Sequence, residues 1–243
     1  MRNLRILAAV GLVAAAGAAN AGVTSTWTLA SDYDFRGITQ SAQDPAIQAS
    51  IDYAHDSGWY IGGWASNVDF GDESDINWEL DVYTGFTGTM ENGIGWDAGL
   101  VYYTYPDDSD ANYFEIYGSL SKDWFKGKLW YSNDFGGDST SGDTPAWYVE
   151  GNGTFPLPNN FSILAHAGYN FGDYWDDLKH TDPKSGRPYI DYSLGVGYTA
   201  GNFNLALKWV DGSDLKEADG TPHDVFSSEA RVVFTIATTF PWK

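Results

Sequence analysis

Apolar and polar residues alternate with a period of two over most of the chain beyond residue 21. In one segment Trp78, Leu80 and Val82 fall on one face, while Glu79 and Asp81 fall on the other. This alternation indicates half-buried β-strands, and about 9–11 residues suffice to cross a membrane when tilted. Twelve such strands are predicted, at 24–34, 46–55, 59–70, 76–87, 94–105, 113–121, 125–135, 146–155, 161–171, 189–199, 203–210 and 229–240.

The connections between the predicted strands alternate in length. Longer, acidic segments follow the odd-numbered strands, and tight turns such as 56–58 and 200–202 follow the even-numbered ones. Outer-membrane barrels show this asymmetry, with short periplasmic turns and longer outer loops. The pattern predicts an all-β fold, an antiparallel transmembrane β-barrel of about 12 strands with both termini on the periplasmic side. A secreted, soluble β-sandwich stays open as an alternative.

The first residues read as an export signal. Arg2 and Arg5 precede an apolar run, which ends in Ala19-Asn20-Ala21 and fits the small-x-small cleavage rule. The run is shorter than the roughly 20 residues of a membrane-spanning helix. We therefore expect a signal peptide over residues 1–21, cleavage after Ala21, and a barrel over 22–243 in the outer membrane of a Gram-negative cell.

The amino-acid composition limits which binding partners and which kinds of chemistry the protein can have. Aromatic residues make up 16% of the chain, as suits strands with aromatic girdles, and the absence of cysteine excludes disulfides and thiolate metal sites. The formal charge of -20 makes nucleic acid a poor partner because phosphates would be repelled. The acidic loops lack the spacing of a calcium loop, although cations bridging them to lipopolysaccharide stay open.

Residues 31–40 read SDYDFRGITQ, and this run resembles the start of the TorF-like porin family, also catalogued as the Gcw_chp family of proteobacterial outer-membrane proteins. The resemblance continues through Ser57-Gly58-Trp59-Tyr60 and the run from Tyr102 to Pro106. It implies an exported barrel, named a porin by analogy, without an assigned substrate or catalytic residues. The motif positions are Ser31, Asp32, Tyr33, Phe35, Arg36, Gly37 and Gln40.

The family usually ends on an aromatic residue that the barrel-assembly machinery reads. Here Phe240 is followed by Pro241, Trp242 and Lys243, a departure that puts the insertion signal in doubt. The other expected partners are outer-membrane lipid, lipopolysaccharide and small solutes or cations, and we expect a monomer.

The polar faces of the predicted strands point into the barrel and carry charge. We expect them to form a cation-preferring pore for passive diffusion of small hydrophilic solutes or ions. An alternative is a barrel closed by salt bridges, whose acidic loops bind a partner or lipopolysaccharide. Arg36 is expected to join the inward charges, and the predicted pore-lining residues are Asp52, Glu79, Asp81, Asp97, Glu115, Lys128, Glu150, Asp191, Lys208, Glu229 and Arg231.

Nothing in the sequence predicts an enzyme. His166 is the one histidine well inside a predicted strand, but Ala167 and Gly168 follow it, so the His-x-Ser pairing of outer-membrane phospholipases is missing. The four histidines are scattered and form no metal motif. We expect no catalytic residues, no metal site and no cofactor.

Overall fold

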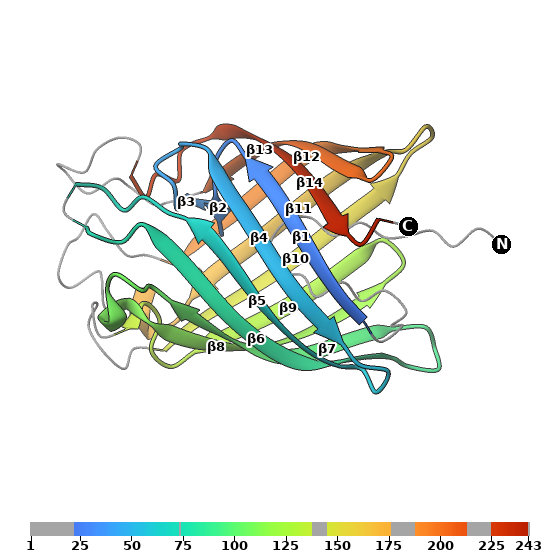
Figure 1. Ribbon diagram of the computed structural model, residues 1–243, viewed down its shortest axis with the longest axis horizontal. Coiled ribbons are helices and arrows are strands. Elements are labelled where there is room, and N and C mark those ends of the chain that lie inside the picture. The colour runs from blue at the N-terminus through green and yellow to red at the C-terminus, as the bar shows by residue number, and fades with distance from the viewer. Residues whose placement is uncertain (1–21, 73, 138–144, 176–187, 213–224, 243) are drawn as a thin grey trace.

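A computed structural model describes residues 22–72, 74–137, 145–175, 188–212 and 225–242. Within these ranges twelve long antiparallel strands form one closed barrel (Figure 1). These strands are β1 (Gly22–Ala30), β4 (Ala46–Ala54), β5 (Trp59–Asn67), β6 (Trp78–Thr89), β7 (Gly95–Thr104), β8 (Tyr113–Lys122), β9 (Phe125–Ser132), β10 (Ala146–Pro156), β11 (Phe161–Phe171), β12 (Tyr189–Ala200), β13 (Phe203–Gly212) and β14 (Arg231–Phe240).

Each barrel strand pairs with its neighbours along the chain, and β1 pairs with both β4 and β14 to close the sheet. Two further short strands, β2 (Asp34–Phe35) and β3 (Ile38–Thr39), form a hairpin between β1 and β4, and a short 3-10 helix, η1 (Ser109–Ala111), follows β7. The described ends of the chain lie at the same end of the barrel, which we call the turn end (Figure 1). The opposite, loop end carries the longer connections.

The prediction of about 12 antiparallel strands is confirmed, and most boundaries agree within three residues. The largest error lies at the predicted strand 24–34, because β1 ends at Ala30 and the chain then turns into the barrel. The prediction that placed Glu229 inside the last strand is also wrong, since β14 begins at Arg231.

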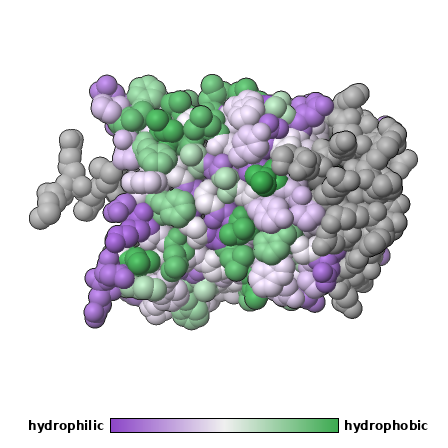
Figure 2. All heavy atoms as spheres, turned by 180° about the vertical axis from the view of Figure 1, so that it is seen from behind, coloured by the Kyte–Doolittle hydropathy of each residue, from purple (hydrophilic) through white to green (hydrophobic). Residues whose placement is uncertain are grey.

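The barrel buries polar residues and exposes apolar ones. Ile51 is 61% exposed on the outer face, whereas Glu115 and Asp191 on the inner face are each 1% exposed. Green, hydrophobic residues gather around the middle of the wall, and hydrophilic ones rim the turn end at the left of Figure 2. This is the surface that a bilayer requires of a transmembrane barrel, because the outward side chains meet lipid.

No helix in the described part of the chain has the length and hydropathy needed to cross a membrane.

Because of the apolar belt, the loss of folding free energy on introducing a charged residue should depend on where along the barrel wall the residue lies. Leu194 lies outward in the middle of β12, so Leu194→Arg should destabilise the folded barrel by about 2–4 kcal/mol. Leu157 is exposed in a tight turn beyond β10, and Leu157→Arg should cost about 0–1 kcal/mol. Equilibrium urea unfolding in lipid vesicles, followed by tryptophan fluorescence, measures both. Equal losses for the two variants would contradict a membrane-facing belt.

Candidate functional site

The hairpin β2–β3 turns on two residues that adopt positive φ. Arg36 has φ 53° and Gly37 has φ 83°, and positive φ at both central positions is the pattern of a type I′ two-residue hairpin. A side chain at position 37 would also collide with the barrel wall, because a Cβ there would lie 2.6 Å from the Cβ of Asp191. Glycine therefore permits both the turn and its close approach to β12.

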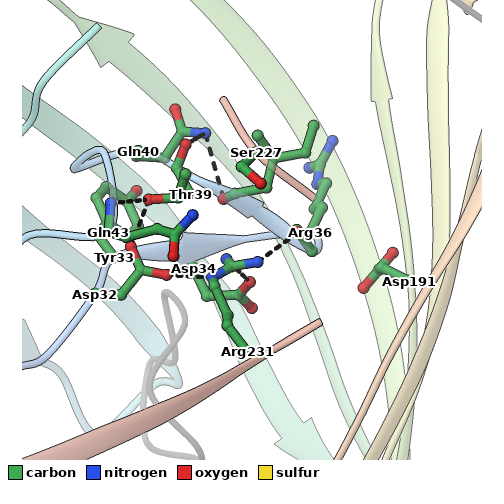
Figure 3. A network of polar contacts seen from close by, with 12 residues as sticks. Asp32, Tyr33, Asp34, Arg36, Thr39, Gln40, Gln43, Asp191, Ser227 and Arg231 are labelled. Carbon is green, nitrogen blue, oxygen red and sulfur yellow. Dashed lines mark hydrogen bonds and ion pairs between the residues drawn. The ribbon is translucent and has the colours of Figure 1, made fainter. Parts of the chain in front are cut away.

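The two sides of the hairpin are joined at their base by Asp32. Its carboxylate accepts hydrogen bonds from the Thr39 hydroxyl at 2.5 Å and from the Ser41 hydroxyl at 3.2 Å (Figure 3). The Thr39 backbone N–H donates to the carbonyl of Ser227, which precedes β14. The hairpin is thereby fixed to itself and to the last outer connection.

Arg231, at the start of β14, binds the hairpin from one wall. Its guanidinium forms ion pairs with Asp32 and, at 2.6 Å, with Asp34, and it donates to the Gly37 carbonyl at 3.1 Å. One arginine thus neutralises two carboxylates and caps a turn carbonyl. Charge-assisted bonds of this kind are among the stronger ones in proteins. Burial raises the pKa of Asp34, and the charge of Arg231 acts against that shift.

Arg36, at the tip of the hairpin, reaches the opposite wall. Its guanidinium lies 2.6 Å from Glu115 on β8 and 4.4 Å from the centre of the Tyr148 ring on β10. The rings of Phe35, Trp130 and Phe135 lie within 6 Å as well. Burial lowers and the Glu115 carboxylate raises the pKa of Arg36, with a net upward shift, so this residue carries a permanent positive charge.

The hairpin spans the barrel. Strands β14 and β8 are six places apart in the closed order of twelve described strands, so Arg231 and Glu115 belong to opposite walls. The Tyr189 hydroxyl on β12 adds a bond to the Arg36 carbonyl at 3.0 Å. At this level Tyr103 and Glu115 are each only 1% exposed. Between β6 and β8, therefore, the hairpin leaves almost no surface of the inner wall accessible to water.

Tyrosine hydroxyls satisfy most carboxylates of the inner wall. Tyr33 of the hairpin donates to Glu79 at 3.0 Å, and Tyr105 donates to its other oxygen at 3.3 Å. The same pairing joins Tyr103 to Glu115, Tyr60 to Asp97 and Tyr83 to Asp52. A buried carboxylate is stable when such donors replace water.

A second polar cluster lines β10, β11 and β12. The ring of His166 lies 2.7 Å from Asp191 through Nε2 and 2.8 Å from the Asn152 amide oxygen through Nδ1. The Asn152 amide nitrogen donates to Glu150 at 2.7 Å. Because both ring nitrogens then face acceptors, this arrangement suits a doubly protonated, cationic imidazole between the Asp191 carboxylate and the Asn152 amide oxygen.

Among the other predicted pore-lining residues, Lys128 is buried with its ammonium 3.6 Å from the centres of the Tyr117 and Trp130 rings. Lys208 lies half-buried on the inner face of β13. Asp81 is buried on β6, where no N–H or hydroxyl group donates to it and its neighbour is the Glu79 carboxyl group. Glu229 is exposed and precedes β14, outside the barrel wall.

The structure joins four motif residues to three inward charges, which the sequence did not predict: Asp32, Tyr33, Arg36 and Gly37 contact Glu79, Glu115 and Arg231. Asp32 and Asp34 alternate with Tyr33 and Phe35 as strand residues do, so the sequence pattern predicts the end of a strand there. No sequence pattern marks Asp34 or Asn152 as functional. The pair Arg36-Gly37 is not one of the Asn-Gly, Asp-Gly or Gly-Gly pairs that mark such a turn, so the sequence gives no clear hairpin signal there.

A closed antiparallel barrel with an apolar belt and a charged interior is the architecture of outer-membrane porins. Solved porin structures share it at very low sequence identity. The structure titled "KdgM porin" aligns with a TM-score of 0.55 at 8% identity over 90% of this chain and 99% of that one. The structure titled "NanC porin structure in rhombohedral crystal form" aligns with a TM-score of 0.51 at 9% identity over 90% and 98%. At these identities the likeness concerns the fold.

The family is shown by the sequence itself. The model of the family described as "Bacterial protein of unknown function (Gcw_chp)" matches residues 14–240, so the chain belongs to the Gcw_chp family. The resemblance found in residues 31–40 is thereby confirmed. A comparison with curated proteins found no significant match.

Arg231 and Glu115 hold the hairpin from opposite walls, so removing the Arg231 side chain should free one side of the hairpin. Arg231→Ala leaves Asp32 and Asp34 without their cation, which should cost about 3–5 kcal/mol if the hairpin stays buried and should therefore release it. Trypsin should then cut after Arg36 in the folded barrel, as read by mass spectrometry of the fragments.

The matched control is Lys122→Ala, which removes a cation from the exposed end of β8. It should leave Arg36 as protected as in the unmodified protein. Continued protection of Arg36 in folded Arg231→Ala barrels would show that Arg231 does not hold the hairpin.

Proposed function

We propose that this protein is an outer-membrane porin that lets small hydrophilic solutes or ions diffuse passively, with a preference for cations. The observation that carries the proposal is an acidic interior inside a porin fold. Among the described residues, nine inward carboxylates face five lysines and arginines, namely Asp32, Asp34, Asp52, Glu79, Asp81, Asp97, Glu115, Glu150 and Asp191 against Arg36, Lys126, Lys128, Lys208 and Arg231.

The excess of carboxylates favours cations by ordinary electrostatics. A charged wall next to a low-dielectric membrane raises the local concentration of ions of opposite sign and excludes those of the same sign. His166 moderates this field where it bridges Asp191 to Asn152, but it does not reverse the balance.

We propose that solutes pass along the wall from β10 to β13. Some polar side chains there are partly exposed, with His166 at 21% and Glu150 at 15%, and Lys208 is half-buried, although Asp191 is buried. Asp34 of the hairpin is likewise partly exposed. The wall from β6 to β8 is packed against the hairpin, and the hairpin tip also lies against Asp191 and Tyr189 of β12. We therefore propose that the passage beside β10 to β13 is narrow at the level of the hairpin.

The solute of a structural neighbour does not transfer to this chain. One solved structure is titled "KdgM porin in complex with disordered oligogalacturonate" and aligns with a TM-score of 0.52 at 8% identity, over 91% of this chain and 99% of that one. Oligogalacturonate is a polyanion, and the acidic interior described above would repel it. We therefore propose small cations and neutral solutes instead.

The proposal includes the setting of the barrel. A signal peptide over residues 1–21 would direct export, the barrel-assembly machinery would insert the chain as a monomer, and the loop end would face lipopolysaccharide. The proposal assigns the protein no catalytic role.

A closed barrel is the second candidate, and the hairpin favours it. Arg36 and Arg231 are both paired with carboxylates inside the barrel, and the hairpin they hold fills much of its width at the loop end. In that case the acidic outer loops, rather than a pore, would bind a partner or lipopolysaccharide.

Reversal potentials in planar bilayers test the cation preference. In a potassium chloride gradient the unmodified protein should give a potential of the cation-selective sign. The double variant Asp52→Asn, Glu150→Gln removes two partly exposed inward charges and should move the potential toward zero. Glu91→Gln removes an exposed charge from a turn and should leave it unchanged.

Conductance itself separates the two candidates. Stepwise channels from the folded, unmodified protein would support the pore. If the unmodified protein shows no conductance and Arg231→Ala shows stepwise channels, the hairpin closes the barrel. An unaltered reversal potential in the double variant would contradict selection by inward carboxylates.

A further inference from the structure

The inner face of β6 holds a buried carboxylate that no donor group reaches. Asp81 is 2% exposed, and neither of its oxygens accepts a hydrogen bond from an N–H or hydroxyl group, while the Glu79 carboxyl group lies within hydrogen-bonding reach of it. The nearby tyrosine hydroxyls are committed elsewhere, since Tyr103 donates to Glu115, while Tyr105 and Tyr33 donate to Glu79. An ionised carboxylate in this state is strongly unfavourable unless a cation accompanies it.

The surroundings of Asp81 add negative charge. Glu79 lies two residues away on the same face of β6, and both Glu79 and Glu115 interact electrostatically with Asp81. Arg36 of the hairpin is paired with the Glu115 carboxylate. In this group three carboxylates therefore share one arginine, and Glu79 and Asp81 lack a cation.

Aromatic residues flank the same position. In the strand register Asp81 stands opposite Trp64 on β5 and opposite Tyr103 on β7. The Trp64 ring packs edge-on against Tyr33 of the hairpin, with ring centres 5.4 Å apart. Aromatic faces attract cations, most of all when water is excluded. The hairpin, β5 and β7 thus enclose Asp81 with groups that favour a positive ion.

We propose that Asp81 and Glu79 bind one small monovalent cation, an alkali-metal or ammonium ion, between the wall of β6 and the inward hairpin. This inference rests on the proposed function, because the ion would reach the site through the barrel interior. No group of three or more His, Asp or Glu with a metal-binding arrangement occurs among the described residues, so the site does not suit a divalent metal centre. A monovalent ion needs fewer charges and can contact both oxygens of Asp81.

A proton shared with Glu79 is the competing way to neutralise Asp81. That proton would lie on one oxygen of Asp81 and leave the second without a donor. Diffraction distinguishes the two possibilities, because a hydrogen atom scatters X-rays far more weakly than a heavy alkali ion.

Anomalous diffraction from crystals grown in rubidium chloride tests the site. The unmodified protein should show a rubidium peak beside the Asp81 carboxylate. Asp81→Asn should lose the peak, because the amide keeps the shape but not the charge. Asp97→Asn is the matched control: Asp97 is buried on the neighbouring β7, but the Tyr60 hydroxyl already satisfies it, so the peak should remain.

Thermal unfolding in detergent gives a second readout that needs no crystal. At neutral pH and constant ionic strength, potassium or rubidium should raise the midpoint by several degrees over N-methylglucamine, which is too large to enter. Asp81→Asn should abolish the difference, and Asp97→Asn should keep it.

The outcomes separate this proposal from the porin. A rubidium peak in a barrel that conducts no ions would support the cation site and contradict the proposed porin function. Conductance without a peak beside Asp81, and without a cation-specific shift of the midpoint, would overturn the site and identify a shared proton at Asp81.

Discussion

Closure of the sheet is the constraint on which the rest of this structure depends. In a bilayer no water satisfies the backbone, so each N–H and carbonyl of a spanning strand must bond to a neighbouring strand. The pairing of β1 with β14 removes the last free edge. A closed sheet of alternating residues has one face toward lipid and one toward the interior, which explains why Ile51 is exposed while Glu115 is buried.

Closure with twelve strands creates an interior that must be filled or hydrated. Barrels of about eight strands are filled by their own side chains, whereas those of 16–18 strands hold an aqueous channel. This barrel uses both solutions. The hairpin β2–β3 and the tyrosines occupy the space beside β6 to β8, and the wall from β10 to β13 keeps partly exposed polar groups such as Glu150 and His166. Arg231 on one wall and Glu115 on the opposite wall hold the hairpin through ion pairs, so charge pairing determines how narrow the remaining passage is.

The strands and their faces could be predicted from the sequence because both follow from a local pattern with a period of two. The hairpin could not, since Asp32 to Phe35 alternate like a strand and their partners are remote. Arg231 lies 199 residues from Asp32, and Glu115 lies 79 residues from Arg36. No local signal encodes such pairs.

The inward charges were predicted as a set, but their individual roles were not. Glu79 and Asp81 occupy equivalent positions in the pattern, yet Glu79 receives two tyrosine hydroxyls and Asp81 receives none. The difference arises because the hairpin brings Tyr33 to Glu79. Only the packed interior distinguishes a satisfied carboxylate from a candidate binding group.

Ion flux into sealed vesicles tests the central claim, a hairpin-narrowed passage that prefers cations. Vesicles containing the folded protein and a fluorescent dye would be mixed rapidly with thallium, a cation that quenches one dye, or with iodide, an anion that quenches another. The account predicts fast quenching by thallium and much slower quenching by iodide. Equal rates, or faster entry of iodide, would contradict it.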